Sequence, residues 1–448
     1  MLVPQNKLIL IATLVLVPLA LLPALDPALI PATLALLLAF VLIVAVDAFR
    51  VYGKTNDIGA AFPPLFRFTQ DRDATLDLVL TRTALQLRRL RIGLDLPGEL
   101  GGVLDTYVTD LPEAAPRVHV ALPCRPLRRG NYTVQNVYLE EHSPFGWWAF
   151  QGMAKAETQV RVYPNLRHDY RAMAALFLNR AAFGIHPQRQ VGKGREFEKL
   201  REYVPGDDFG DIHWKATARR GRPITKDFQV EKTQEVYVVI DASRLSAREI
   251  PGKDGAAPAP APVIERFIAA ALTLGMAAER QGDLFGLVAF GDRVRRFVPA
   301  KGGKGHFAAC REALYTLTAS DVTPDFEEVC SFIRLRLRKR ALLIFLTNLD
   351  DPVLAERFAH DVGLLSRHHL VVVNMVKPAG VNPIFAGPAI ADTRDIYDRL
   401  AGHLRHRDLD ELARVLKRRN VALSLIEHED LIVKLVAQYM NLKQRQLL

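Results

Sequence analysis

The stretch Gly194–Phe228 reads GREFEKLREYVPGDDFGDIHWKATARRGRPITKDF and mixes apolar and aromatic side chains with charges of alternating sign. A nucleic-acid-binding arm would instead be a run of one sign. Val204–Asp208 predicts a turn, because proline presets one backbone dihedral, glycine tolerates positive φ, and aspartate can bond nearby amides. Asp211 stands where an N-cap would open a short helix through Trp214 and Ala218.

Two interpretations of this signature segment stay open. It is either a surface loop and helix laced with ion pairs, or a segment whose aromatics pin it to a domain and hold Arg201, Asp207, Asp208 and Lys215 in one constellation. In the second case we expect Trp214 to be buried and the charges to act as an inter-domain clamp or a docking site, through complementary charge. The candidate interaction residues are Arg201, Glu202, Tyr203, Gly206, Asp207, Asp208, Trp214, Lys215 and Arg219.

The strings EFEKLREYVPGDD (196–208) and IHWKATARRG (212–221) resemble the signature of the bacterial family known as domain of unknown function 58. The resemblance implies that a von Willebrand factor A-like domain follows the signature. It also implies a partner, a MoxR-type AAA+ ATPase, since the genes often lie side by side. The family often has an arginine at the position of Gly210, so any ion pair made there is missing. Arg129-Gly-Asn-Tyr132 and Pro144-Phe-Gly146 are similar to motifs in the small β-domain of that family.

Length and composition limit the classes of protein to which this chain can belong. The length of 448 residues allows two or three domains, and 49% hydrophobic residues fit a globular protein with some membrane content. The net charge of +10 suggests affinity for acidic surfaces without choosing between lipid, nucleic acid and acidic protein. Cys124, Cys310 and Cys330 form no CxxC pair, so we expect buried free thiols in a reducing compartment.

Two uncharged apolar runs, Leu8–Leu25 and Ala28–Val46, each have about the 20 residues that a helix needs to cross a membrane. Lys7 precedes the first run, and Arg50 and Lys54 follow the second. By the positive-inside rule both ends face the cytoplasm. The sequence therefore predicts a multi-pass protein of the inner (cytoplasmic) membrane with its soluble domains in the cytoplasm. A cleaved signal peptide is the disfavoured alternative, because the N-terminal region is weakly basic and a second span follows at once.

Residues 62–164 alternate between apolar and polar side chains with turns between, which predicts an antiparallel β-sandwich. The aromatic corner Pro144–Trp148 is expected to fill its core. A helical linker over Tyr170–Ala182 leads to the signature.

After the signature, the continuous apolar run Glu235–Ile240 is typical of a strand buried on both faces. Strands and helices then alternate, which predicts a mainly parallel, Rossmann-like sheet covered on both faces. Pro251–Pro262 is expected to be a flexible excursion and His368-His369 an exposed loop. The predicted strands are 284–290, 294–299, 341–347, 370–376 and 421–426, and the predicted helices are 264–280, 307–316, 326–338, 392–417 and 431–443. The predicted domains are a transmembrane hairpin (1–55), a β-sandwich-like domain (60–165), a linker with the signature (166–232) and the α/β domain (233–448), von Willebrand A-like by the resemblance.

In an open parallel sheet, ligands bind beyond the carboxyl ends of the strands. Cation-binding von Willebrand A domains carry Asp-x-Ser-x-Ser there, with a threonine and an aspartate from later loops. The resemblance places Asp241, Ser243, Thr323 and Asn348 at this site, with Leu245 where the second serine would stand. Hard cations prefer oxygen ligands. A neutral amide, Asn348, replaces a carboxylate, and an apolar side chain, Leu245, replaces a hydroxyl. This favours a structural remnant, in which Asp241 accepts backbone amides, over a Mg²⁺ site.

Several enzyme classes lack their motifs in this chain: no GxxxxGK[ST], HExxH or GxSxG is present. Gly302–Gly305 is expected to open a helix. The basic run Arg334–Arg340 suits a helix C-terminus better than a nucleic-acid patch, since cations there offset the helix dipole and no aromatic is interleaved. The sequence thus predicts a membrane-anchored cytoplasmic scaffold or adaptor without cofactor or nucleic acid. The alternative is a metal-dependent hydrolase using Asp241 with Asp207 or Asp208, for which no nucleophile and base pair is visible.

Overall fold

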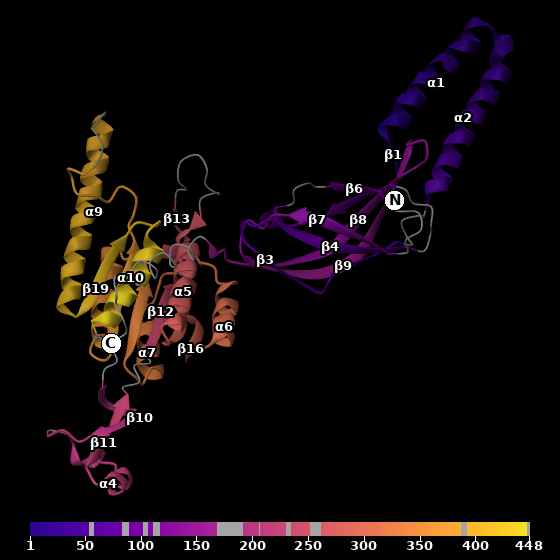
Figure 1. The fold of residues 1–448 in the computed structure, drawn as a ribbon. Coiled ribbons are helices and arrows are strands. Elements are labelled where there is room, and N and C mark those ends of the chain that lie inside the picture. Colours follow the sequence, from indigo (N-terminus) through magenta and orange to yellow (C-terminus); the bar gives the residue numbers. More distant parts are fainter. Residues whose placement is uncertain are drawn as a thin grey trace. The chain divides into compact units, whose positions relative to one another are not determined.

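The computed structural model describes residues 1–52, 58–82, 89–101, 106–110, 117–167, 191–205, 207–229, 234–250, 261–386 and 392–445. The chain forms two compact units, Met1–Asn165 and Leu166–Leu448 (Figure 1). Lys54, Gly206, the expected linker helix at 170–182 and residues 251–260 of the proline-rich excursion lie outside the described residues.

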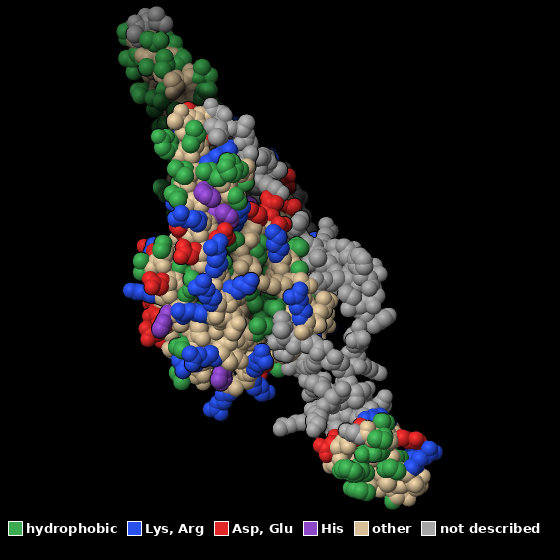
Figure 2. All heavy atoms as spheres, turned by 90° about the vertical axis from the view of Figure 1, so that its left-hand side faces the viewer, with side chains coloured by type: hydrophobic (Ala, Val, Ile, Leu, Met, Phe, Trp, Pro, Cys, Tyr) green, Lys and Arg blue, Asp and Glu red, His purple; other side chains and the backbone are tan. Residues whose placement is uncertain are grey.

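The first unit contains two apolar helices, α1 (Asn6–Leu25) and α2 (Ile30–Val51), joined by the 3₁₀ turn η1 (Pro27–Leu29). Asp26 caps that turn by accepting a hydrogen bond of 2.9 Å from the amide of Ala28. Each helix contains a window long and apolar enough to cross a membrane. Both windows are almost wholly exposed within the unit, and hydrophobic side chains cover the helical hairpin (Figure 2). This exposure separates them from ordinary core helices, which are mostly buried.

The rest of the first unit is a β-sandwich. One sheet has the order β1-β9-β8-β5-β6, with β3 also paired to β9, and the second has the order β2-β4-β7. Inward side chains of both sheets share one core, in which Leu76 and Leu78 lie with Val134 and Val160. All pairs are antiparallel except β3–β9, which is parallel. The elements are β1 (Leu2–Pro4), β2 (Ile58–Ala61), β3 (Leu65–Thr69), β4 (Ala74–Arg82), β5 (Arg89–Leu94), η3 (Gly98–Leu100), β6 (Thr106–Asp110), β7 (Arg117–Cys124), β8 (Gly130–His142) and β9 (Trp148–Tyr163).

The aromatic corner Pro144–Trp148 does not fill the sandwich core, so that prediction is wrong. It forms the β8–β9 turn and packs against α2: the ring centroids of Trp147 and Phe40 are 6.2 Å apart. The indole N–H of Trp148 donates to the carbonyl of Val44 at 3.2 Å. Alternation along the strands could not reveal this contact, because it depends on where the apolar helices leave the sandwich.

The signature segment forms a small lobe in the second unit. Strand β10 (Val191–Glu202) pairs antiparallel with β11 (Ile224–Gln229), and η4 (Phe209–Asp211) and α4 (Trp214–Arg220) lie between them in sequence. Gly221 ends α4 in the left-handed region, with φ of 67°, where a side chain would be strained.

A six-stranded sheet of order β16-β15-β12-β17-β18-β19 forms the centre of the second unit. All neighbours are parallel except β15–β16, an antiparallel hairpin at the edge. Helices α5, α6 and α10 share a core with one face and α7, α8 and α9 with the other. The elements are β12 (Glu235–Asp241), η5 (Arg244–Ala247), β13 (Glu249–Ile250), β14 (Ala261–Pro262), α5 (Val263–Arg280), β15 (Leu284–Phe290), β16 (Val294–Lys301), α6 (Lys304–Leu314), α7 (Phe326–Arg336), β17 (Ala341–Leu346), α8 (Pro352–Leu365), β18 (Leu370–Val376), α9 (Thr393–Arg418), β19 (Val421–Ile426) and α10 (Leu431–Gln444).

Two features of this unit were not predicted. Helix α8 was missed, although Asp351 caps it by accepting from the amides of Val353 and Leu354. His369 is 5% exposed rather than in an open loop, and its Nδ1 accepts from the amide of Ala341 at 3.3 Å. Burial lowers the pKa of His369, so the neutral ring is favoured there.

Candidate functional site

The signature lobe is organised by an ion pair between Arg201, on β10, and Asp207. The two terminal nitrogens of the guanidinium each donate to one carboxylate oxygen at 2.7 Å, a two-point geometry that fixes both groups. Asp207 Oδ2 also accepts from the amide of Val204 at 3.0 Å, which closes the turn. The bonds from Arg201 and Val204 hold the pKa of Asp207 below its usual range. This half of the predicted constellation is therefore assembled.

The helix start within the signature differs from the prediction. Asp208 caps η4, accepting from the amide of Gly210 at 3.0 Å. Asp211 ends that 3₁₀ turn, and His213 caps α4 instead, with Nδ1 accepting from the amide of Ala216 at 3.1 Å. Asp211 was a reasonable candidate by residue type, but a histidine cap leaves little trace in sequence.

Trp214 is 69% exposed, so the expectation that its ring is buried is wrong. Phe209 is 73% exposed and lies against Tyr203, with ring centroids 5.9 Å apart. Val204 and Leu200 are exposed as well. The lobe anchors itself through the buried Ile212 and Ile224, and leaves its larger apolar groups accessible.

The remaining charged positions of the signature lie on the surface of the lobe. Lys215 and Arg219 are exposed on α4. Glu202 is ion-paired at 2.7 Å with Arg222, and both side chains are mostly exposed, so this pair contributes little stability. Gly206 lies outside the described residues. The structure thus unites Arg201 with Asp207, while Asp208 serves as a cap and Lys215 stays on the surface.

The second candidate site lies at the carboxyl end of β12, where Asp241 is wholly buried. Its Oδ1 accepts from the amide of Ser243 at 2.8 Å, and its Oδ2 accepts from the hydroxyl of Thr347 at 2.6 Å. Burial raises the pKa of Asp241, although these hydrogen bonds oppose the rise. Thr347 is the partner that sequence reasoning missed. It follows β17, a parallel neighbour of β12, so its nearness could have been inferred from the sheet order.

The other expected ligands of this site are either hydrogen-bonded to the backbone or exposed. The hydroxyl of Ser243 accepts from the amide of Leu245 at 3.3 Å. The amide group of Asn348 donates to the carbonyl of Leu245 at 3.1 Å, and its buried Oδ1 has no partner within the described residues. Thr323 is exposed. One carboxylate with both oxygens already hydrogen-bonded does not fit Mg²⁺, which needs oxygen ligands in near-octahedral geometry.

A polar hollow of about 550 Å³ lies beside these strand ends, between the β15–β16 turn and the loop after α6. Arg295 donates to Asp292 at 3.1 Å, so part of its positive charge is offset. The sequence showed no motif here, because the lining comes from two separate segments of the chain. The lining residues are Asp292, Arg293, Val294, Arg295, Arg296, Thr316, Leu317 and Thr318.

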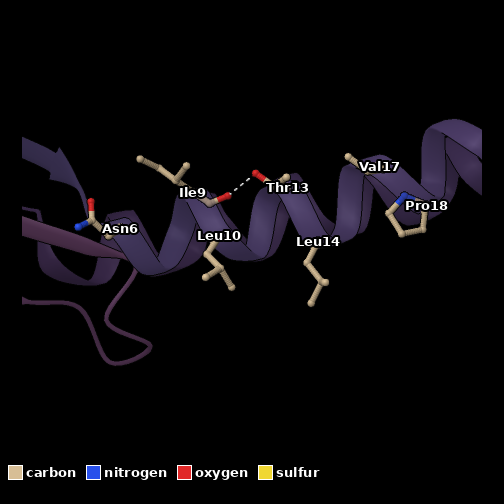
Figure 3. Close-up of a pocket in the computed structure, with 7 residues that line it drawn as sticks. All are labelled: Asn6, Ile9, Leu10, Thr13, Leu14, Val17 and Pro18. Atoms are coloured by element: carbon tan, nitrogen blue, oxygen red, sulfur yellow. Dashed lines mark hydrogen bonds between the residues drawn. The ribbon is translucent and has the colours of Figure 1, made fainter.

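A larger hollow, of about 690 Å³, is lined by α1 alone (Figure 3). Its walls are Asn6, Ile9, Leu10, Thr13, Leu14, Val17 and Pro18, so it is an open apolar helix surface and not a ligand cleft. Thr13 donates its hydroxyl to the carbonyl of Ile9 within the helix at 2.8 Å.

The described residues offer little for covalent or metal chemistry. They contain no group of three or more His, Cys, Asp or Glu side chains that could hold a metal ion. Cys310 lies 3.5 Å from the Nε2 of His306, but burial raises the pKa of the thiol to about 12, so it is not a thiolate at neutral pH. All three cysteines are free and buried, as predicted.

Residues 199–387 match the model of the family described as "Protein of unknown function DUF58". Uncharacterized protein Rv1480 of Mycobacterium tuberculosis is 23% identical over 237 residues, which cover 52% of this chain and 69% of that protein. Uncharacterized protein Mb1516 of Mycobacterium bovis matches to the same extent. These descriptions name no enzymatic activity.

Among solved structures, the chain is similar to the SpRpn10 VWA domain, with 10% identity, a TM-score of 0.29, and coverage of 46% of this chain and 95% of that one. It is also similar to an aerotolerance-related membrane protein of Bacteroides fragilis, with 12% identity, a TM-score of 0.29, and coverage of 47% and 99%. TM-scores this low do not establish a shared fold, so the fold is defined by the strand order given above. The family match confirms the resemblance that the signature indicated: residues 199–387 are similar to the family described as Protein of unknown function DUF58.

Proposed function

We propose that the protein is a multi-pass scaffold or adaptor of the inner membrane, with its soluble parts in the cytoplasm, and that it works with a MoxR-type AAA+ ATPase in the assembly or maturation of a protein complex. The membrane anchor is supported by two exposed apolar helices of spanning length. The cytoplasmic orientation is supported by Lys7 and Arg50, which flank the two helices, while the turn between them carries no lysine or arginine. The ATPase comes from the family resemblance.

One observation carries the adaptor role: the signature lobe exposes four large apolar side chains around a fixed polar turn. Exposed apolar groups rimmed by charge mark protein interaction sites, and tryptophan is favoured at their energetic centres. The Arg201–Asp207 pair holds the turn in one shape, so a partner meets a preorganised surface. Hydrophobic side chains lie among acidic and basic ones on this lobe (Figure 2). The exposed apolar residues are Leu200, Val204, Phe209 and Trp214.

We assign the sheet of the second unit to the von Willebrand A-like class, and propose that it acts without a bound cation. The support is the central position of β12, with a single antiparallel strand, β16, at one edge. Asp241 then stabilises the loop after β12 through Ser243 and Thr347. The hydrolase alternative gains no support, because Asp241 is buried away from solvent. Asp207 is paired with Arg201, and Asp208 caps η4.

Co-purification tests this function. The tagged protein is extracted in detergent from membranes of cells that also produce a MoxR-type ATPase of the same organism. We expect the protein to stay in the membrane fraction during an alkaline wash, and the ATPase to elute with it. Release by the wash contradicts the anchor, and an eluate free of ATPase contradicts the adaptor role.

A further inference from the structure

The aromatic corner Pro144–Trp148 has no role in the proposed adaptor function, yet it is bonded closely to the second apolar helix. Asp47, near the end of α2, is wholly buried and accepts from the hydroxyl of Ser143 at 2.6 Å and the amide of Phe145 at 3.3 Å. An acidic group at the end of an apolar helix needs such partners, because an unpaired carboxylate in a low-dielectric region is costly. These hydrogen bonds therefore fix the position of the corner along the axis of α2.

The corner lies beside the apolar part of the helix. Phe40, whose ring contacts Trp147, precedes Asp47 by seven residues, or about 10 Å along the helix axis. The apolar window of α2 extends from Pro27 to Val51, so both Phe40 and Asp47 lie inside it. If α2 spans the bilayer, a turn packed beside this segment reaches below the headgroups.

The backbone of the corner is suited to a place poor in water. Pro144 has no N–H, and the amide of Gly146 donates to the carbonyl of Ser143 at 2.9 Å. The amides of Trp147 and Trp148 both donate to the hydroxyl of Ser143, at 3.1 and 3.0 Å. With Phe145 bonded to Asp47, every amide from Phe145 to Trp148 has a partner inside the protein. A turn in water has no need of this, whereas lipid demands it.

The side chains match the boundary between headgroups and acyl chains. Phe145 is 55% exposed and lies against Trp147, with ring centroids 5.3 Å apart. A Cβ built on Gly146 would lie 3.7 Å from the ammonium of Lys7, which places an exposed cation next to the two rings. Aromatic rings and a neighbouring lysine are typical anchors at the interfacial level of a membrane.

We propose that the aromatic corner is a membrane-surface anchor in which Phe145 and Trp147 insert at the boundary between headgroups and acyl chains, with Lys7 facing lipid phosphate. The occupant of this surface is lipid, because the corner is continuous with the apolar helices. This inference rests on the proposed membrane anchoring. It adds that the β-sandwich is held against the bilayer and does not hang freely below it.

Tryptophan fluorescence tests the inference, because the chain has three tryptophans, Trp147, Trp148 and Trp214. The full-length double variant Trp148→Phe/Trp214→Phe reports on Trp147, and Trp147→Phe/Trp148→Phe reports on Trp214 as the matched control. Both are reconstituted in phosphatidylcholine and phosphatidylglycerol vesicles that contain lipids brominated either near the headgroup or near the end of the acyl chain. We expect Trp147 to lose most of its emission to the shallow bromines and less to the deep ones, and Trp214 to keep its emission in both.

Unchanged Trp147 emission in protein that resists an alkaline wash overturns the inference and leaves the membrane anchor standing. Release of the protein by the wash contradicts the anchor, and the inference with it. A second probe covers the case in which Trp148→Phe disturbs the corner. The native cysteines are buried, so Phe145→Cys can be labelled selectively with an environment-sensitive fluorophore. Its emission is expected to shift to the blue in vesicles, and a water-like emission there overturns the proposal.

Discussion

The hydroxyl of Ser143, in the β8–β9 turn, donates a hydrogen bond of 2.6 Å to Oδ2 of Asp47, near the end of α2. The same oxygen of Ser143 accepts from two backbone amides. One small side chain thus satisfies a buried carboxylate and closes a turn, and it connects the apolar hairpin to the sandwich. A buried group of this kind is costly to leave without its partner.

Ser143→Ala is therefore expected to lower the free energy of unfolding by about 1–3 kcal/mol, because Asp47 loses a donor and two amides lose an acceptor. Thermal unfolding of the full-length protein in detergent measures this. Ser366→Ala is the matched control, since its hydroxyl donates to the carbonyl of Gly363 at the end of its own helix. Equal losses of unfolding free energy for the two variants would show that the hydroxyl of Ser143 stabilises the protein no more than that of Ser366.

Asp241→Asn is expected to stabilise the second unit increasingly as pH rises. Burial raises the folded-state pKa of Asp241 above its unfolded value of about 4. The folded state thus holds the proton more tightly, and stability falls as pH rises from that value through the raised pKa. Asparagine does not titrate, so the variant does not lose this stability as pH rises. Unfolding free energies of parent and variant over the acidic to neutral range test it, and a difference that does not change with pH contradicts the assignment.

The protein is expected to bind Mg²⁺ weakly or not at all, because both oxygens of Asp241 are engaged and Leu245 and Asn348 stand at two ligand positions. Calorimetry on the parent measures this. The double variant Leu245→Ser/Asn348→Asp restores a hydroxyl and a carboxylate and should bind more tightly. Micromolar affinity of the parent, abolished by Asp241→Ala, would show an intact cation site.

Both chain ends are expected in the cytoplasm. A periplasm-dependent phosphatase should be inactive when fused after Leu448 and active when inserted in the turn at Asp26-Pro27. Activity of the fusion after Leu448 would reverse the orientation inferred from Lys7 and Arg50.

The sequence predicted strands best where they are buried on both faces. Glu235–Ile240 was found because a strand buried on both faces leaves a continuous apolar run, and β12 now spans Glu235–Asp241. The pairing of Arg201 with Asp207 was predictable because a Pro-Gly turn brings them close in space. The exposure of Trp214 was not predictable. Large apolar side chains are buried on average, and the sequence does not distinguish a tryptophan that binds a partner from one in a core.

The hydrogen-bond partners of Asp47 could not be predicted from the sequence for a different reason. Its contacts lie about a hundred positions away, in the turn at Ser143 and Phe145. No periodic pattern connects such residues, and only the folded sandwich brings them together. The contact between Asp241 and Thr347 is different, because it follows from the pairing of β12 with β17 in the sheet.

The central claim is that the exposed aromatic side chains of the signature bind the ATPase, and a binding titration tests this claim most directly. A purified MoxR-type ATPase of the same organism is titrated against the whole protein in lipid nanodiscs, for the parent and for Phe209→Ser/Trp214→Ser. Leu335→Ser is the matched control, because Leu335 is 81% exposed on α7, outside the lobe. Unfolding temperatures are recorded for all three. We predict that the double variant unfolds at the parental temperature and binds at least about tenfold more weakly, as loss of central aromatic anchors does, while the control binds like the parent. Unchanged affinity in a folded double variant would contradict the account.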